Sequence, residues 1–374
     1  MSSQSKKLTI PLYPIPLPRA IPFAQLGGIC TSVPKSGALT PKAIKNAYGF
    51  PPQTNLSRIK IACIEAFQND TLENDLQVFA EYFGIKNANV TAVFPFGKSK
   101  GQSERWKTES ALDVQWLNAL AESADIYCVF SPTDEFEYMF RTVKYAAEQL
   151  KCSIIIMSFG TREFLSQSQM SEYFSETSDT MFICAAGDYG GNVFFPSASQ
   201  GVLSVGGSSV ALSERGLRMS SETAWSFGGG GPSKYEKIPA FQSVFDGISD
   251  MSGGFRATPD VCFAASYNPG VSIYISSSDL DGNTMCGWNT TGGTSFSAVA
   301  LGAVAAHLKK SSKELYGNNL QGYLYALAGG TKYDKPQYFF YDVTSGSNGR
   351  YSAKVGWDFC TGLGSPVVKQ IIEG

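Results

Sequence analysis

The sequence predicts an α/β fold of three layers with a mostly parallel central sheet. Short apolar runs alternate with amphipathic helical stretches, and this order is typical of a parallel sheet covered on both faces. The 374 residues include 38 glycines and 18 prolines, enough for the many turns that such a chain needs. Hydrophobic residues make up 43% of the chain, so a chain of this length can bury one sizeable core.

Six apolar runs have the length and composition of strands. They cover residues 59–67, 124–130, 153–159, 181–186, 202–206 and 271–276. The clearest helix covers residues 135–150, where Phe136, Met139, Phe140 and Val143 recur at helical spacing. In a parallel sheet, functional residues gather beyond the carboxyl ends of the strands.

The chain divides into two unequal parts. Residues 1–38 form a Pro-rich N-terminal arm without a sustained period, which we expect to lie passively on the surface; covering a cleft or docking a partner are the alternatives. Residues 39–374 form a single domain without internal repeats. We expect neither a signal peptide nor a membrane span, because prolines break the first apolar run and no later run is long enough.

Composition argues against several classes of partner. Thirty Lys and Arg residues face 32 Asp and Glu residues, for a formal net charge of -2, and no block of either sign stands out. The sequence therefore predicts no nucleic-acid partner and no attraction to an anionic membrane. The eight cysteines show no spacing typical of a metal site.

The segment Gly292-Gly293-Thr294-Ser295 precedes a long run of small apolar residues, 298–306. Glycines let the backbone turn sharply, and a serine at the first turn of a buried helix lies in the positive end of the helix dipole. Ser295 is therefore a candidate nucleophile. An ordinary N-capping serine is an equally good interpretation of this segment alone.

A serine nucleophile needs a base within hydrogen-bond reach. The only histidine, His307, lies twelve positions beyond Ser295 on the same expected helix, roughly 18 Å away at about 1.5 Å per residue. It cannot be the base. Near the helix end, a charged His307 would instead favour the helix dipole.

Two carboxylates offer an alternative base. Glu109 and Asp113 are four residues apart and share a helix face with Trp116 and Leu117. If that face is buried, two such carboxyls raise each other's pKa and can share a proton. A solvated acidic face is the simpler interpretation.

Two further acidic motifs stand out. Asp188 follows an apolar strand in Gly187-Asp188-Tyr189-Gly190, where a protonated carboxyl could donate to an oxyanion and an ordinary turn is the alternative. Asp342 and Asp358 flank a glycine-containing loop that could offer carboxylates and carbonyls to a hard cation, or could be a solvated loop.

The four motifs occur along the chain in the order Glu109 and Asp113, Asp188, Ser295 and Asp358, and together they resemble the sedolisin family of serine-carboxyl peptidases from about Leu39 to the C-terminus. The resemblance implies a subtilisin-like fold and a peptidase domain over residues 39–374. It implies that Ser295 attacks the scissile carbonyl, that Glu109 takes its proton, that Asp113 supports Glu109 and that Asp188 stabilises the oxyanion, at acidic pH.

The resemblance also implies one structural Ca²⁺ ion. Its ligands would be the carboxylates of Asp342 and Asp358 and the carbonyls of Val343, Gly356 and Lys354, the last standing where a glycine is usual.

We expect a monomeric serine-type peptidase acting on peptides or proteins. Acyl transfer, as in peptide ligation or cyclisation, and a non-catalytic peptidase-fold binding protein are the alternatives. The family implies a secreted or lysosomal, acidic location. The missing signal peptide and propeptide leave the cytoplasm open, and the sequence does not separate endopeptidase from exopeptidase action.

Overall fold

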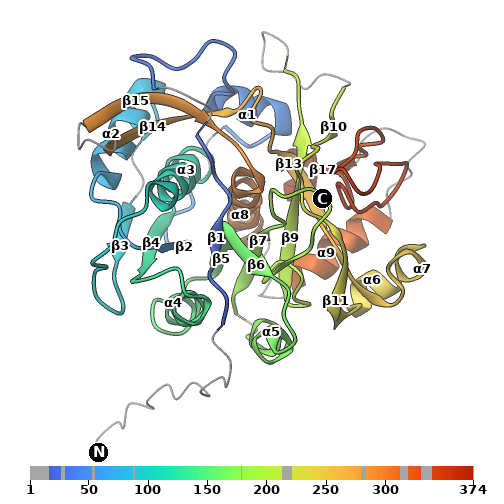
Figure 1. The fold of residues 1–374 in the computed structure, drawn as a ribbon. Helices are drawn as coiled ribbons and strands as arrows, with labels where there is room; N and C mark the ends of the chain where they lie inside the picture. The colour runs from blue at the N-terminus through green and yellow to red at the C-terminus, as the bar shows by residue number, and fades with distance from the viewer. Residues whose placement is uncertain are drawn as a thin grey trace, which may run out of the picture.

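The computed structural model describes residues 17–26, 30–52, 55–86, 89–177, 179–212, 221–278, 284–311, 319–329 and 339–373. Its centre is a sheet with the strand order β10-β9-β7-β5-β2-β4-β3, in which β13 also pairs with β9 (Figure 1). All of these pairings are parallel except that of β10. The strands are β2 (Lys60–Ala66), β3 (Asn89–Val93), β4 (Asp125–Ser131), β5 (Ile154–Met157), β7 (Met181–Ala185), β9 (Val202–Ser209), β10 (Thr223–Ala224) and β13 (Val261–Ala264).

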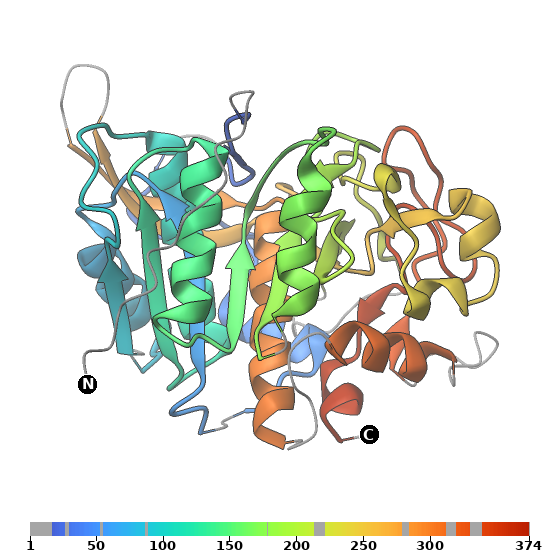
Figure 2. The same ribbon diagram turned by 90° about the horizontal axis from the view of Figure 1, so that it is seen from below.

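Helices cover both faces of this sheet (Figure 2). Alternate side chains of β2 show the two sides: Ile61 and Cys63 join one apolar cluster with α3 (Glu104–Leu120) and α8 (Thr294–Ser311). Ala62 and Ile64 join another cluster with α4 (Phe136–Glu148) and α5 (Gln167–Glu176). The predicted three layers, the first five strands and the helix at 135–150 are confirmed, within a few residues at their ends.

Helix α8 is buried from Thr294 to Leu308, which explains its small apolar residues. Gly302 shows how tight the packing is, because a Cβ there would lie 2.4 Å from Cδ1 of Ile156 in β5. None of the helices that the structure describes has the length and apolar character needed to cross a membrane.

The strand predicted at 271–276 is a strand, but it lies outside the parallel sheet. It is β14 (Val271–Ser278), which forms an antiparallel hairpin with β15 (Thr284–Thr291). Side chains of α3 fix this hairpin: Gln115 Nε2 donates to Tyr274 O at 2.6 Å, and Trp116 Nε1 donates to Ser272 O at 2.9 Å. Strand β15 leads directly into Gly292-Gly293 and the start of α8.

The remaining elements surround this core. They are α1 (Pro41–Tyr48), α2 (Leu72–Phe83), β6 (Phe159–Arg162), β8 (Phe194–Phe195), β11 (Gly231–Lys237), α6 (Ala240–Ser243), α7 (Ile248–Ser252), β12 (Phe255–Thr258), α9 (Asn319–Gly329), β16 (Phe340–Tyr341), β17 (Ser365–Pro366) and α10 (Val368–Glu373).

The N-terminal arm is not a passive surface segment, so that expectation is wrong for the part of the arm that is described. Strand β1 (Ile21–Pro22) pairs with β6 and runs through the middle of the molecule between β6 and α3 (Figure 1). Phe23 and Ala24, which follow it, are fully buried.

Candidate active site

Helix α3 carries Glu109 and Asp113 into the interior. Both side chains are 0% exposed, so the interpretation as a solvated acidic face is wrong. Their spacing of four residues places both on the face of α3 that meets the sheet and α8. Ser158, just beyond β5, donates its hydroxyl to Asp113 Oδ2 at 2.8 Å.

Ser295 lies in the first turn of α8 and meets Glu109. The Ser295 hydroxyl lowers the pKa of Glu109 through its proximity, although the two groups do not complete a hydrogen bond of good geometry. Ser295 Oγ and Glu109 Oε1 are buried and have no hydrogen-bond partner among the described residues. Because Ser295 Oγ caps no backbone amide, the N-cap interpretation is wrong.

Burial dominates the protonation of these two carboxyls. It is the largest cause of the raised pKa of Glu109, followed by the charge of Asp113, while the Ser295 hydroxyl and the Ala24 amide oppose it. Burial also raises the pKa of Asp113 to about 8, against hydrogen bonds from Ser158 and Glu65. A carboxyl whose pKa lies above its usual range is a better proton acceptor when ionised.

The structure adds a carboxyl that the sequence analysis missed, Glu65 of β2. Its side chain points to the same face of β2 as Ile61 and Cys63, toward α3. It is fully buried and lies near Asp113. Burial and then the charge of Asp113 raise the pKa of Glu65. The proximity of the two groups raises the pKa of Glu65 and lowers that of Asp113, although neither Glu65 oxygen has a hydrogen-bond partner of good geometry among the described residues. An acidic residue inside an otherwise apolar strand was the available signal.

The buried carboxyls predict that the protein loses stability as the pH rises. Their pKa values are raised in the folded state, so the stabilisation is complete below about pH 4 and declines as the pH rises; the part due to Asp113 is lost as the pH passes about 8. Glu65→Gln removes one of these titrations. We expect its melting temperature to fall by a few degrees less between pH 4 and pH 8 than that of the unmodified chain.

Thermal melts across this pH range measure the difference. Glu73→Gln, on an exposed position of α2, is the control and should follow the unmodified chain. Equal pH slopes for all three proteins would contradict the placement of a buried, protonated Glu65.

Asp188 follows β7 and lies against the start of α8. Its Oδ1 accepts hydrogen bonds from the amide (2.9 Å) and the hydroxyl (2.8 Å) of Thr294, and its Oδ2 accepts one from Tyr267 Oη at 2.9 Å. Burial outweighs these three bonds and raises the pKa of Asp188 to about 6. An ordinary turn aspartate would not need this environment. No sequence motif marked Tyr267 as a partner of Asp188.

Gly293 allows Asp188 to approach. The φ of Gly293 is +88°, and a Cβ there would lie 2.3 Å from Asp188 Oδ2. Only a glycine therefore fits between β15 and α8 at this point.

His307 is remote from this centre, as predicted, but its expected role at the helix dipole is wrong. It is buried, its Nε2 lies 3.1 Å from Leu120 O, and burial lowers its pKa. A neutral imidazole has no charge to offer the dipole.

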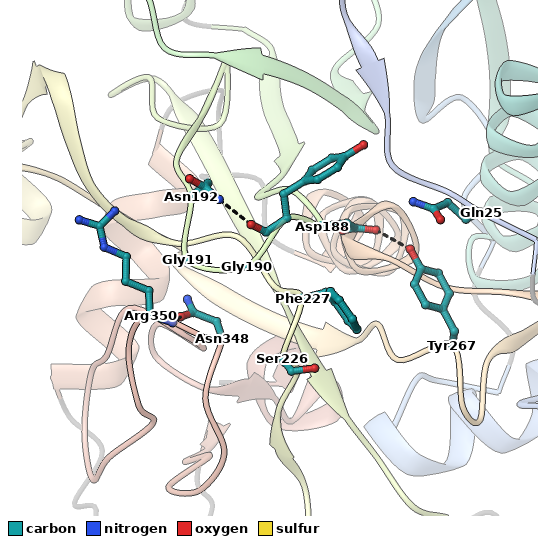
Figure 3. A pocket seen from close by; sticks show the side chains of 12 residues that line it. Gln25, Asp188, Gly190, Gly191, Asn192, Ser226, Phe227, Tyr267, Asn348 and Arg350 are labelled. Carbon is teal, nitrogen blue, oxygen red and sulfur yellow. Dashed lines mark hydrogen bonds between the residues drawn. The ribbon is translucent and has the colours of Figure 1, made fainter.

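A cavity of about 750 Å³ opens beside Asp188 (Figure 3). Tyr267 reaches Asp188 from one side, and Gln25 of the arm lies at the edge. The far wall consists of Asn192, Asn348 and Arg350. The centre thus lies next to open space large enough for several peptide residues.

The loop predicted to hold a cation brings its two aspartates together. Asp358 is buried and Asp342 is half-buried, and burial and then the charge of Asp358 raise the pKa of Asp342. Asp342 Oδ2 accepts from Gly356 N and Asp358 Oδ2 accepts from Lys354 N, both at 2.9 Å. Within the described ranges, no cluster of three His, Cys, Asp or Glu side chains could hold a metal. The two carboxylates are close enough for the charge of Asp358 to act on Asp342, and carboxylate oxygens are ligands that a calcium ion prefers.

Comparison with known proteins identifies the family of this chain. A family model described as "Subtilase family" matches residues 98–357. The chain belongs to the subtilase family.

Particular relatives narrow the assignment to the serine-carboxyl peptidases of the sedolisin type. Kumamolisin of Bacillus sp. (strain MN-32) is 29% identical over 371 residues, which cover 90% of this chain and 63% of kumamolisin. Sedolisin of Pseudomonas sp. (strain 101) is 30% identical over 188 residues, which cover 46% of this chain and 29% of sedolisin. The chain thus spans less than two thirds of the length of either relative.

The fold agrees with the same group. A solved structure of Pseudomonas sedolisin, a serine-carboxyl proteinase complexed with two molecules of pseudo-iodotyrostatin, matches with a TM-score of 0.76 at 22% identity. The match covers 91% of this chain and 98% of that one. The predicted subtilisin-like fold and the predicted family are confirmed.

Proposed function

We propose that this chain is a serine-type peptidase that cleaves peptide bonds through an acyl-enzyme on Ser295. One observation carries the proposal: the Ser295 hydroxyl lies close enough to Glu109 to lower its pKa, and Ser295 Oγ and Glu109 Oε1 are buried without hydrogen-bond partners among the described residues. A buried hydroxyl and a buried carboxyl oxygen without hydrogen bonds are costly to keep, which is typical of a reactive pair.

Each side chain then has a defined part in the reaction. Glu109 takes the proton of Ser295 as Oγ attacks the scissile carbonyl, and returns it to the leaving amine. Asp113 touches no substrate; held by Ser158 and Glu65, it positions Glu109 and raises its basicity. Asp188, when protonated, donates a hydrogen bond from its O–H to the oxyanion, and water then hydrolyses the ester.

The role of Asp188 supports an acidic working range. Both of its oxygens accept hydrogen bonds in this structure, so donation requires Oδ2 to carry a proton and Tyr267 to turn its hydroxyl hydrogen away. The pKa of about 6 keeps that proton on the carboxyl in mildly acidic solution.

Active-site labelling combined with product analysis tests the proposal. A peptide aldehyde or a fluorophosphonate should add to Ser295 alone, located by peptide mapping, and a peptide library incubated at pH 4–6 should yield fragments whose summed mass exceeds the parent by one water. Products heavier by an added amine would indicate acyl transfer. Absence of both adduct and products would indicate a non-catalytic peptidase fold.

We also propose one structural Ca²⁺ ion at Asp342 and Asp358, with the carbonyls of Val343, Lys354 and Gly356. The ion would offset the repulsion between the two carboxylates. We expect a chelator to lower the melting temperature by several degrees and added Ca²⁺ to restore it. In Asp358→Asn, neither treatment should matter.

The control is Asp250→Asn, at an exposed position of α7, which should respond as the unmodified chain does. An unchanged melting temperature of the unmodified chain in chelator would count against the calcium site.

A further inference from the structure

Tyr267 brings a hydroxyl group to the wall of the cavity beside Asp188. It lies in the loop after β13, and its side chain points across the cavity toward Asp188 (Figure 3). Tyr267 Oη donates to Asp188 Oδ2 at 2.9 Å. A protonated Asp188 requires this hydroxyl hydrogen to turn away, and the direction in which it turns decides what Tyr267 does in the reaction.

Neighbouring segments fix the position of the Tyr267 ring. The ring packs edge-on against Trp225, with 5.2 Å between ring centroids. Gly292 lets the backbone come close, because a Cβ there would lie 3.1 Å from Tyr267 Cδ1. Gly293 N donates to Ala265 O at 2.7 Å, which ties the loop of Tyr267 to the start of α8. The oxygen is therefore held in place, while the hydroxyl hydrogen can still rotate about the C–O bond.

The same oxygen lies within reach of a backbone carbonyl. Tyr267 Oη donates a long hydrogen bond of 3.5 Å to Phe23 O, in addition to its bond to Asp188. The Cβ position at Gly293 lies 3.2 Å from Phe23 O and 2.3 Å from Asp188 Oδ2, so the carbonyl and the carboxyl border one small space. The Tyr267 hydrogen can thus point either to Asp188 or to a peptide carbonyl without any movement of the ring.

The protonation of Asp188 selects between these two acceptors. An ionised Oδ2 accepts the Tyr267 hydrogen, whereas an Oδ2 that carries a proton is itself a donor and leaves that hydrogen to the carbonyl. Burial, followed by the charge of Asp188, raises the pKa of Tyr267 far above its usual range. The other titratable groups that act on Tyr267, Glu109 and Tyr189, raise this pKa further. The hydroxyl therefore keeps its hydrogen in both states of Asp188.

We propose that Tyr267 is a catalytic residue that supplies a second hydrogen-bond donor to the oxyanion, beside the protonated Asp188. This rests on the proposed peptidase function. As Ser295 Oγ bonds to the scissile carbonyl carbon, the carbonyl oxygen gains negative charge and accepts one hydrogen bond from each of the two O–H groups. Neither proton is transferred, and both donors keep theirs when the intermediate collapses to the ester. The two bonds are stronger in the transition state than in the bound substrate, so they accelerate the reaction.

One titration then controls both donors. Loss of the proton from Asp188 removes its own O–H, and the carboxylate also takes back the Tyr267 hydrogen. The two-donor arrangement therefore forms only while Asp188 is protonated.

Tyr267→Phe tests this role, because it removes the hydroxyl and keeps the ring. At pH 4, below the pKa of about 6 of Asp188, we expect kcat on an added peptide to fall about 10²-fold while KM changes by less than about threefold. The hydrogen bond from Tyr267 lowers the pKa of Asp188. Without it, the fall of activity with rising pH should begin about one pH unit higher.

A transition-state analogue separates donation to the oxyanion from a structural role. A peptide aldehyde adds to Ser295 and places an oxygen where the oxyanion forms, so its Ki in Tyr267→Phe should rise by about the same factor as kcat/KM falls. The Kd of an uncleaved peptide should be the same, within about threefold, for Ser295→Ala with and without Tyr267→Phe. Tyr235→Phe, at an exposed position of β11, is the control and should behave as the unmodified chain does.

The Asp188→Asn variant provides a second test. The amide donates at every pH and cannot accept the Tyr267 hydrogen through its NH₂ group, so Tyr267 should still serve the oxyanion in that variant. Adding Tyr267→Phe to Asp188→Asn should lower kcat by about tenfold or more at every pH. Circular dichroism melts check that all variants fold.

The outcomes distinguish this proposal from the proposed function. If Tyr267→Phe keeps full kcat at pH 4 and only moves the pH at which activity falls, Tyr267 tunes Asp188 alone, and its catalytic role is overturned while the peptidase stands. A loss of kcat with an unchanged Ki for the aldehyde would overturn it as well. If the unmodified chain cleaves no peptide and no label reaches Ser295, both proposals fail.

Discussion

Ser295→Ala is expected to lower kcat for peptide hydrolysis by about 10⁶-fold, the magnitude found when the serine of a subtilisin triad is removed. The reason is structural as well as chemical: Ser295 is buried at the start of α8, and no hydroxyl that could replace it adjoins Glu109 in the described part of the chain. Steady-state kinetics on a peptide cut by the unmodified chain measures the loss. Ser297→Ala, two residues later in α8, is the control for helix packing.

Glu109→Gln should cost about as much, because the hydroxyl is a poor nucleophile when nothing accepts its proton. The double variant with Ser295→Ala should be no worse than either single variant, since the two side chains act as one unit. Glu104→Gln, at the exposed start of α3, should keep full activity. Additive losses in the double variant would show that Glu109 acts independently of Ser295.

Most of the fold could be predicted because each strand of the parallel sheet corresponds to one contiguous apolar stretch of the sequence. Strands β2, β4, β5, β7 and β9 are buried at nearly every position, so most of their residues are apolar or small. Hairpin β14–β15 has a similar composition, and nothing local separates it from a central strand. The antiparallel pairing of β14 with β15 and the contact of β14 with α3 are visible only in the tertiary structure.

The residues of the candidate site could be predicted where they lie in short motifs. The prediction failed for contacts between residues far apart in the sequence. Glu109 and Asp113 share one helix face, so their spacing already places them together. Tyr267 meets Asp188 from 79 residues away. Glu65 meets Asp113 only because β2 and α3 lie against each other.

The arm shows the same limit. Its prolines suggested an extended segment, and the described part of the arm is extended. The hydrophobic periodicity of a sequence cannot show which part of the molecule such a segment covers. The pairing of Ile21 with Gly160 and the contact of Ala24 with Glu109 join segments more than 80 residues apart.

Asp188 provides the sharpest link between pKa and mechanism. In the mechanism we propose, the reactive state has Glu109 ionised and Asp188 protonated, and the pKa values of both buried carboxyls are raised mainly by burial. As the pH rises through about 6, Asp188 loses its proton, can no longer donate and repels the oxyanion. The activity of the unmodified chain should therefore fall tenfold for each pH unit above this value.

Asp188→Asn should remove this fall while keeping much of the activity. The two donors of Thr294 hold the oxygen of the amide in the place of Oδ1, so the NH₂ group takes the place of Oδ2, beside Tyr267 and Gly293. Asparagine donates at every pH, so kcat should persist above pH 6. Asp188→Ala, without a donor, should lose about 10²–10³-fold at every pH. A pH–rate profile of the three proteins decides the matter: if the asparagine variant still falls near pH 6, another group sets that limb and Asp188 is not the oxyanion donor.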